Sequence, residues 1–473
     1  MQKIQACVEV LSQDELLMIH RGSLGILERV GFRVPNEGCL EGCARTGALV
    51  DKTSGIVRIP SSLMEEILQS MRVVTKVAPA NRDVLPLKGV ISTQLNLVES
   101  TKKIRRPGIL DDVRKSIALV EHLDNFPTSN AAVIPSDVDP ALTDIVSFQQ
   151  IYGYSRKPGG TYVLTPFSAR HIISMAQVMN RSVWFLLDPV SPLQFRSENI
   201  EIATIFARAG QPIYIGTMVM AGGTGPITLA GTVTLHNAEL LAAMFLVYSI
   251  SEQFHADIYN SGPHSMDPLS MICSFGSPNQ ALFGICMAQL GRYYGISRVA
   301  NVGLTDALAP DFQCGVEKAV SAAYSALAGV QTIGCQGIVG ADQGFSFEQL
   351  VLDNEWLSYS NYILHGVQVT EETIAADLIE SVGISGNFLA EEHTVKHLRQ
   401  SFLKSKLFKR QGWDAWVADG GKESLQRAYA FVEQATAGYR STQPVCSPSE
   451  WEELCRLVEV SRREHLQGLS VRS

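Results

Sequence analysis

The sequence lacks the marks of several protein classes. Its nine cysteines are scattered, odd in number and without a Cys-x-x-Cys pair, so neither a disulfide framework nor a zinc knuckle is expected. No stretch reaches the roughly 18 apolar residues that a membrane span needs, because the richest one, 238–250, is interrupted by Glu239. The amino-terminal residues do not resemble a signal peptide. We therefore expect a cytoplasmic protein that does not use a membrane.

The sequence also has fewer basic than acidic residues. The 39 Lys and Arg residues are outnumbered by 47 Asp and Glu residues, which gives a net charge of −8 and argues against a nucleic-acid partner. Hydrophobic residues make up 46% of the 473 residues and charged residues only 18%, which excludes a disordered chain and allows a large core.

The familiar catalytic motifs are missing as well. The glycine-rich run at 222–225 lacks the lysine of a phosphate-binding P-loop, so nucleotide binding is not expected. His171 has no second histidine three or four residues away and no His-Glu-x-x-His sequence occurs, so no bound metal is expected. No Gly-x-Ser-x-Gly nucleophile elbow is found.

What the sequence does contain, from Gly89 onward, is an alternation of short β-rich apolar runs with helical patterns. The runs are 90–97, 131–134, 161–164, 183–187, 213–220, 256–259, 298–302 and 330–339. The helical patterns between them cover 111–123, 141–152, 168–179, 197–208, 229–251, 279–294 and 311–328, with caps expected at Ser168, Ser197 and Asp311 and after the helices at Gly295 and Gly329.

Eight strands, each followed by a helix, predict an α/β fold of the (β/α)8 TIM-barrel type. The rival is an open doubly wound sheet, which usually carries a Gly-x-Gly-x-x-Gly turn after its first strand, and none is present there. We expect a barrel at 89–345, preceded by a mainly helical extension at 1–88 with a short hairpin. A last barrel helix and a second helical extension are expected at 346–473.

The amino-terminal extension shows its own signals. Ser12 and Glu15 have the spacing of a capping box, which opens an apolar-periodic helix that stops at Gly31. Residues 48–51 and 55–60 read as two short strands, and a further helix begins at Ser61.

Polar and aromatic residues gather at the predicted strand ends, on the face where barrel enzymes carry their chemistry. They include Tyr162, Asp188, Asn260, His264, Asn301, Gln336, Asp342, Phe345, Glu348 and Trp356. Such a pocket suits a cation such as a quaternary ammonium, held by cation–π contacts of roughly 0.5–2 kcal/mol each. Each residue also has a plainer interpretation: Tyr162 as core, His264 as a solvated loop residue, and Asp188 and Asp342 as turn residues.

Four segments resemble the trimethylamine methyltransferase family of corrinoid-dependent methyltransferases. They are Gly222-Gly-Thr-Gly-Pro-Ile-Thr-Leu-Ala-Gly231 with 237–242, Ser274-Phe-Gly-Ser-Pro-Asn279 with 289–295, Phe347-Glu-Gln-Leu-Val-Leu-Asp-Asn-Glu355, and Phe388-Leu-Ala-Glu-Glu-His-Thr394 with Arg399. The similarity covers nearly the whole chain. It implies an α/β barrel with helical extensions at both ends.

The resemblance also implies a reaction. Founding members of the family carry pyrrolysine near the end of a late strand, whereas 334–340 of this chain holds only standard residues. The chain therefore resembles the non-pyrrolysine branch, whose members demethylate quaternary amines such as glycine betaine, proline betaine, carnitine and γ-butyrobetaine. The implied acceptor is the cob(I)alamin of a separate corrinoid protein, so no catalytic residue is assigned.

Residue roles follow as hypotheses from the positions in the motifs. Trp356, Phe345 and Tyr162 are candidate cage walls, and Gln336, Asn260 and Asn301 are candidate polar contacts. His264 is a candidate for the betaine carboxylate, with the amides of 222–224 as a rival, and Glu348 either meets the ammonium or caps a helix. A homo-oligomer is expected.

Two other hypotheses remain open. A barrel lyase or aldolase would need a Schiff-base lysine on a strand, and the predicted strands contain none, since Lys88 precedes the first. A non-catalytic betaine-binding barrel would keep the pocket without the transfer.

Overall fold

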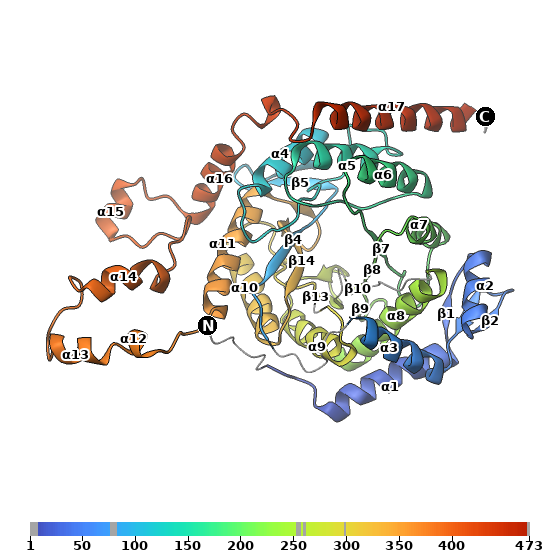
Figure 1. Cartoon of the computed structure of the whole chain (residues 1–473), viewed down its shortest axis with the longest axis horizontal. Coiled ribbons are helices and arrows are strands. Elements are labelled where there is room, and N and C mark those ends of the chain that lie inside the picture. The colour runs from blue at the N-terminus through green and yellow to red at the C-terminus, as the bar shows by residue number, and fades with distance from the viewer. Residues whose placement is uncertain (1–7, 76–82, 252–256, 259–261, 298, 471–473) are drawn as a thin grey trace.

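The computed structural model describes residues 8–75, 83–251, 257–258, 262–297 and 299–470. Short strands lie at the centre, helices surround them, and a chain of small helices in the carboxyl-terminal part extends away from this body (Figure 1).

The amino-terminal extension forms a small unit of three helices and three strands. Its elements are α1 (Gln13–Arg29), β1 (Phe32–Arg33), α2 (Glu37–Thr46), β2 (Leu49–Asp51), β3 (Ile56–Arg58) and α3 (Ser61–Thr75), with the strands ordered β1-β3-β2. The predicted capping box is confirmed, since Ser12 and Glu15 bond each other's backbone amides. Gln289 of the body accepts hydrogen bonds from the amides of Val10 and Leu11, at 3.0 Å each, which ties the start of this unit in place.

Parallel strands make up the centre of the body. They are β4 (Lys88–Ile91), β7 (Phe185–Leu187), β8 (Ile213–Ile215), β10 (Asp257–Ile258), β13 (Val299–Ala300) and β14 (Thr332–Gln336). Strand β8 lies between β7 and β10, and β14 lies between β13 and β4. The pairing of β4 with β14 joins the first strand of the series to the last one. The predicted α/β fold is therefore confirmed.

The second and third predicted strands are much weaker than the sequence suggested. Residues 131–134 and 161–164 form no named strand, and parallel pairing near them is limited to the bridges Gln94–Val133 and Ser129–Gly159. Beside 131–134, the side chain of Asn130 donates to the backbone oxygen of Ile91 in β4, at 2.8 Å, and so takes an acceptor from the ladder between these two segments.

In the part of the chain that the structure describes, eight helices surround the strands. They are α4 (Leu110–Val120), α5 (Thr143–Tyr154), α6 (Pro166–Val178), α7 (Ser197–Arg208), α8 (Leu229–Ile250), α9 (Asn279–Tyr294), α10 (Phe312–Leu327) and α11 (Phe347–Leu364). The helix ends Gly295 and Gly329 adopt positive φ as expected, and Asp311 caps α10. The other two cap predictions were wrong: Thr165 caps α6 because Pro166 takes the first helical position, and Arg196 precedes α7.

Among the described residues, α8 alone is long and apolar enough to cross a membrane by length and composition. It is a core helix of the protein, because α1, α2, α3 and α9 all pack against it. Its buried run includes Glu239, whose carboxylate accepts hydrogen bonds from Ser191 at 2.7 Å and the Leu193 amide at 2.9 Å, and also from Thr217.

Two small sheets extend beyond the ends of the central strands. One contains β9 (Met220–Ala221), β11 (His264–Met266) and β12 (Cys273–Ser274), and the other contains β5 (Asn96–Glu99), β6 (Ile104–Pro107), β15 (Ile338–Val339) and β16 (Gly344–Phe345). Because β5 follows β4 and β15 follows β14 along the chain, the second sheet continues the junction between the first and last strands.

The carboxyl-terminal part is helical, as predicted. It contains α12 (Glu371–Ile374), α13 (Ala376–Val382), α14 (Glu392–Ser401), α15 (Trp413–Ala418), α16 (Ser424–Ala435), the 3₁₀ turn η1 (Tyr439–Ser441) and α17 (Pro448–Ser470). Helix α16 packs on α11, and α17 crosses α5 and α6 (Figure 1).

A buried ion pair links α10 and α11 to the strands. Lys318 Nζ lies 3.1 Å from Asp353 Oδ2 and donates to the backbone oxygen of Gly303 at 3.0 Å. The same carboxylate oxygen accepts from the amide of Gly337, at 2.7 Å, just after β14. Its other oxygen accepts from Trp356 at 2.9 Å, so the carboxylate is surrounded by donors.

Replacement of Lys318 by Met should destabilise the protein by about 3–5 kcal/mol, because it leaves the Asp353 carboxylate buried without a counter-charge. Chemical denaturation followed by circular dichroism measures the effect. The exposed Lys422→Met variant is the matched control and should behave as the parent. A Lys318→Met protein with an unchanged midpoint would show that the pair does not hold the helices to the strands.

Candidate functional site

A hollow opens inside the group of central strands. It is lined by backbone and side chains from β4, from the two weak strands, from the β7 region and from the end of β14. The lining residues are Val90, Ile91, Ser92, Thr93, Asn130, Thr161, Tyr162, Trp184, Leu186, Gly334 and Cys335. Two aromatic side chains, several small polar groups and one thiol therefore face a common space.

Tyr162 lies on the wall of this hollow. Its side chain is 44% exposed, yet burial by surrounding protein atoms is the main cause of its raised pKa. A group that is both reachable by solvent and crowded by protein lies in a concave surface. The charges of Cys335, Asp188 and Asp342 contribute further to the raised pKa of Tyr162, so these three side chains lie around it.

Cys335 owes its position to an irregularity at the end of β14. The register of β14 against β4 shifts between Ile333 and Gln336, and Cys335 has a φ of 60°, which side chains other than glycine rarely adopt. Bulges of this kind change the direction of a side chain next to functional sites. The bulge brings Cys335 to the hollow, where Tyr162 also lies.

Asp342 belongs to a turn in which three consecutive residues, from Gly340 to Asp342, have positive φ. Gln94, which follows β4, donates to Asp342 Oδ1 at 2.5 Å. Burial is the main cause that raises the pKa of Asp342, and this hydrogen bond partly offsets it. The turn thus places a desolvated carboxyl beside the strand ends.

Asp188 occupies a similar position after β7. It accepts a hydrogen bond from Asn199 at 2.9 Å. Burial raises the pKa of Asp188, while the charge of Arg196 acts in the opposite direction. Together, Asp188 and Asp342 give the surroundings of Tyr162 an acidic character.

His264 lies fully buried at the start of β11. Gln280 fixes the tautomer of the His264 ring. The amide nitrogen of Gln280 donates to the backbone oxygens of Pro263 and Asn301, so its side-chain oxygen is the atom that faces His264 Nδ1, at 3.1 Å. Nδ1 therefore carries the proton. Burial lowers the pKa of His264 to about 4, so the ring is neutral at pH 7 and presents Nε2 as an acceptor.

Several buried acceptors near the strand ends have no hydrogen-bond donor within the described part of the chain. They include Asn130 Oδ1 at the hollow itself, His264 Nε2, Asn301 Oδ1 and Gln336 Oε1. Gln336 uses its amide nitrogen to donate to the backbone oxygens of Val302 and Gly334, at 3.2 and 2.7 Å. Acceptors without donors make this region electronegative, which favours a positive charge nearby.

The other residues predicted for the site lie elsewhere. Trp356 is on α11, where its indole donates to Asp353, and it packs against the main core. Phe345 is fully buried in β16 and meets Phe347 edge to face, with ring centroids 5.5 Å apart. Glu348 is buried in the first turn of α11 and accepts from Ser346 at 2.8 Å. Asn260 lies outside the described residues.

The structure does not support the backbone amides of 222–224 as the alternative to His264 for binding a betaine carboxylate. The backbone amides of 222–225 donate within their own turn, to the oxygens of Met220 and Gly225. The prediction that these amides bind an anion was therefore wrong, since a glycine-rich run can close on itself as a tight turn.

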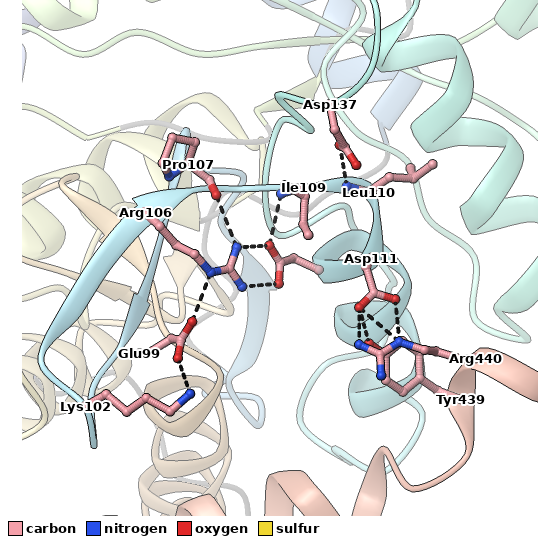
Figure 2. A network of polar contacts seen from close by, with 11 residues as sticks. Glu99, Lys102, Arg106, Pro107, Ile109, Leu110, Asp111, Asp137, Tyr439 and Arg440 are labelled. Carbon is pink, nitrogen blue, oxygen red and sulfur yellow. Dashed lines mark hydrogen bonds and ion pairs between the residues drawn. The ribbon is translucent and has the colours of Figure 1, made fainter.

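Glu348 lines a second, larger cleft between the β5–β6 hairpin, α4 and α16. Figure 2 shows the network of polar contacts among residues of this region. Arg106 makes a two-pronged contact with Asp112, at 2.7 and 2.8 Å, and also contacts Glu99 at 2.9 Å. Asp111 accepts from Tyr439 at 2.7 Å and pairs with Arg440. These charges neutralise one another and fasten the carboxyl-terminal part to α4.

Sequence patterns alone do not point to Cys335 and Trp184, two residues that line the hollow. Asp188 and Asp342, which lie around Tyr162, stand in sequence contexts typical of turns. A bulge and a run of positive φ values leave no clear composition signal. Among the described residues, no group of three or more His, Cys, Asp or Glu side chains is arranged to hold a metal.

These features define an α/β protein with a polar, aromatic hollow at the ends of its central strands. The sequence profile of the trimethylamine methyltransferase (MTTB) family matches residues 1–465. The chain therefore belongs to the trimethylamine methyltransferase family.

Individual proteins of known structure or sequence are also similar to this chain. Trimethylamine methyltransferase MttB of Desulfitobacterium hafniense (strain DSM 10664 / DCB-2) is 30% identical over 434 residues, which cover 88% of this chain and 87% of that protein. Glycine betaine methyltransferase of Desulfitobacterium hafniense (strain Y51) is 27% identical, covering 91% and 92%. The crystal structure of the Methanosarcina barkeri monomethylamine methyltransferase (MtmB) aligns with a TM-score of 0.46 at 12% identity, covering 92% of this chain and 96% of that one.

The neutral state of His264 has a measurable consequence. The unfolded chain binds a proton at an ordinary histidine pKa of 6.5, whereas the folded chain does so only near 4. Stability should therefore fall as the pH drops below 6.5, by about 2 kcal/mol at pH 5 from this residue alone. Denaturation midpoints at pH 7 and pH 5 should differ less in His264→Gln than in the parent. The exposed His122→Gln variant should keep the parental difference, and an unchanged difference in His264→Gln would contradict the assignment.

Proposed function

We propose that this protein transfers a methyl group from a quaternary amine to the cob(I)alamin of a separate corrinoid protein. The substrates considered are betaines: glycine betaine, proline betaine, carnitine and γ-butyrobetaine. Membership of the family and the names of the two relatives, which act on trimethylamine and glycine betaine, support a methylamine donor. The absence of a non-standard residue at 334–340 supports the quaternary branch.

One observation supports a substrate with a permanent positive charge. Tyr162 lines a hollow around which Asp342 and Asp188 lie, and burial raises the pKa of both carboxyls. The raised pKa values mean that the surrounding protein does not fully compensate their negative charge. A quaternary ammonium in the hollow would supply the compensating charge and would meet the faces of Tyr162 and Trp184.

The proposed reaction needs no acid or nucleophile from the side chains of this protein. When the carbon–nitrogen bond breaks, its electron pair stays on nitrogen and gives a neutral tertiary amine, so no acid is needed. The two electrons of the new carbon–cobalt bond come from cob(I)alamin. The protein has to hold one methyl group toward the acceptor and keep water away from it. An aromatic wall, buried acceptors and two carboxyls are suited to this positioning role.

Cys335 and Gln336 occupy the end of the strand that closes the hollow. In our proposal the bulge at Cys335 sets the distance between the ammonium and the aromatic wall. The neutral His264 presents an acceptor, so we assign it to the cationic end of the substrate and leave the carboxylate unassigned. Trp356, Phe345, Glu348 and Asn260 remain predictions from motif position.

A closed eight-stranded barrel is the architecture that fits this function. The pairing of β4 with β14, together with the parallel bridges through Val133 and Gly159, supports a ring in chain order. In this proposal the barrel spans 89–345, and extensions at 1–88 and 346–473 frame it.

The face around the hollow also suits a protein partner. Loops that follow the central strands, and the first residue of α10, expose large apolar side chains. Large exposed apolar patches usually have a binding role. The side chains are Leu95, Leu164, Val190, Met218, Leu269, Met271, Leu308 and Phe312. We assign this rim to the docking of the corrinoid protein. The proposal includes a cytoplasmic location and a homo-oligomer.

The function is tested by mixing the protein with cob(I)alamin and a panel of betaines. Methylcobalamin should form, with at least one betaine, and the visible spectrum reports it directly. Trimethylamine serves as the control substrate and should react poorly. Absence of methylcobalamin with every betaine, or a reaction confined to trimethylamine, would contradict the proposal.

The cage role of Tyr162 has a matched pair of variants. Tyr162→Ala removes a cation–π contact of about 1–2 kcal/mol and should raise the KM for the reactive betaine roughly 5- to 30-fold. Tyr162→Phe keeps the ring and should stay within about twofold of the parent. Equal losses in both variants would show that the hydroxyl, not the ring face, is what the substrate needs.

A further inference from the structure

Basic side chains are rare in the segments that follow the central strands and lead to the next helix. These segments cover 92–109, 135–142, 162–166, 188–196, 216–228, 259–278, 301–311 and 337–346. Their lysine and arginine residues are Lys102, Lys103, Arg105, Arg106 and Arg196. A negatively charged group that binds at this end of the strands therefore has few basic partners available.

All of these residues except the last lie on the β5–β6 hairpin, and most of them are engaged there. Lys102 and Arg106 pair with Glu99, at 2.6 and 2.9 Å. Arg105 Nε donates to the backbone oxygen of Gln343 at 3.0 Å. The remaining lysine lies in the turn of the hairpin.

Arg196 lies at the start of α7, and its backbone is held on both sides. The amide of the preceding Phe195 donates to the backbone oxygen of Arg33 at 3.0 Å, and the Phe195 ring meets Phe32 edge to face, with centroids 5.8 Å apart. The backbone oxygen of Arg196 accepts from the amide of Ile200 at 3.2 Å. Its side chain is exposed, and among the described residues its guanidinium has neither a hydrogen bond nor an ion pair.

The start of α7 is also joined to the wall of the hollow. Asn199 donates to Asp188, which follows β7, at 2.9 Å, and Arg196 precedes Asn199 by three residues, the spacing of one helix side. Trp184, just before β7, lines the hollow. In agreement with this placement, burial raises the pKa of Asp188 and the charge of Arg196 lowers it, while the charge of Asp188 adds to burial in raising the pKa of Tyr162.

From these observations we infer that Arg196 binds the carboxylate of the betaine substrate and so determines the specificity of the site. A guanidinium presents parallel N–H donors that match the two oxygens of a carboxylate. Helix α7 begins without a side-chain cap, so its first amides add to the positive potential at this place. This inference rests on the proposed function, in which the carboxylate end of the substrate has no partner.

The inferred contact gives the substrate one orientation. The ammonium lies at the aromatic wall of Tyr162 and Trp184, near the carboxyls of Asp188 and Asp342. The carboxylate is repelled from these acids and reaches the start of α7, on one side of the hollow, which leaves the rest of the opening to the methyl acceptor. An acidic, aromatic hollow alone would accept any quaternary ammonium, whereas a guanidinium beside it favours those that carry an anion.

The test measures binding with ligands that differ in one charge. Glycine betaine has one carbon between nitrogen and carboxylate and γ-butyrobetaine has three, and the carboxamide of each keeps the ammonium and the chain but lacks the negative charge. Isothermal titration calorimetry gives the Kd of each ligand without a corrinoid. At least one of the two betaines should bind the parent more tightly than its carboxamide does.

Arg196→Gln should raise the Kd of that betaine about 10- to 100-fold, because a charge-assisted hydrogen bond is lost. The Kd of the matching carboxamide should stay within about twofold of the parent. Arg196→Lys keeps the charge without the fork of donors and should lose about 3- to 10-fold for the betaine.

The methyl-transfer assay should repeat this pattern. Arg196→Gln should raise the KM for the betaine at a nearly constant kcat, since the carboxylate contact is present equally in the bound substrate and in the transition state. The control is Arg208→Gln, at an exposed position near the other end of α7, which should match the parent with both kinds of ligand. Circular dichroism should show the same melting for all of these proteins.

A parent that binds neither betaine would overturn the inference, and so would an Arg196→Gln protein that binds the betaine as the parent does. Equal losses for betaine and carboxamide would also overturn it, because they would show that Arg196 only balances the charge of Asp188. Betaine binding that depends on Arg196 without any methyl transfer concerns the proposed function alone. Methyl transfer that does not depend on Arg196 concerns this inference alone.

Discussion

The buried contact between Lys318 and Asp353 is the constraint on which the site region depends. Taking two charges out of water is costly, and this cost is offset only when every donor and acceptor is used. Here the pair binds the oxygen of Gly303 after β13 and the amide of Gly337 after β14. The helices α10 and α11 are therefore fixed to the ends of two strands, and the bulge that carries Cys335 lies directly beside a rigid support.

The sequence predicted most of the architecture, because the signals for it are local. Periodicity located the surrounding helices, and the cap at Asp311 and the capping box of Ser12 were visible as spacing. The weak strands near Val133 and Tyr162 were overestimated, since apolar composition does not reveal that a side chain such as Asn130 takes over a ladder acceptor. The cap predicted at Ser168 is wrong because Pro166 takes the first helical position of α6, and the one at Ser197 is wrong because Ser197 is itself the first residue of α7.

The candidate site was less predictable, because its geometry depends on backbone turns. Tyr162, predicted from its place near a strand end, lines the hollow, and its role as a cage wall stays a prediction. Trp356 and Phe345 share the chemistry of a cage wall but point into helix and sheet packing. Cys335 reaches the hollow, and Asp342 the surroundings of Tyr162, through positive φ values, which depend on tertiary support and cannot be read from residue type.

The pairing of β4 with β14 also bears on how the chain reaches its structure. Residues near position 90 remain without their neighbour until residues near 335 have been made, so this junction is among the most distant contacts of the body in sequence. Contacts of such separation slow folding, and an unpaired strand edge invites association with other chains in the meantime. During synthesis, β4 is therefore an open edge for most of the time that the body is emerging, because α11, the helix that packs against it, is made even later than β14.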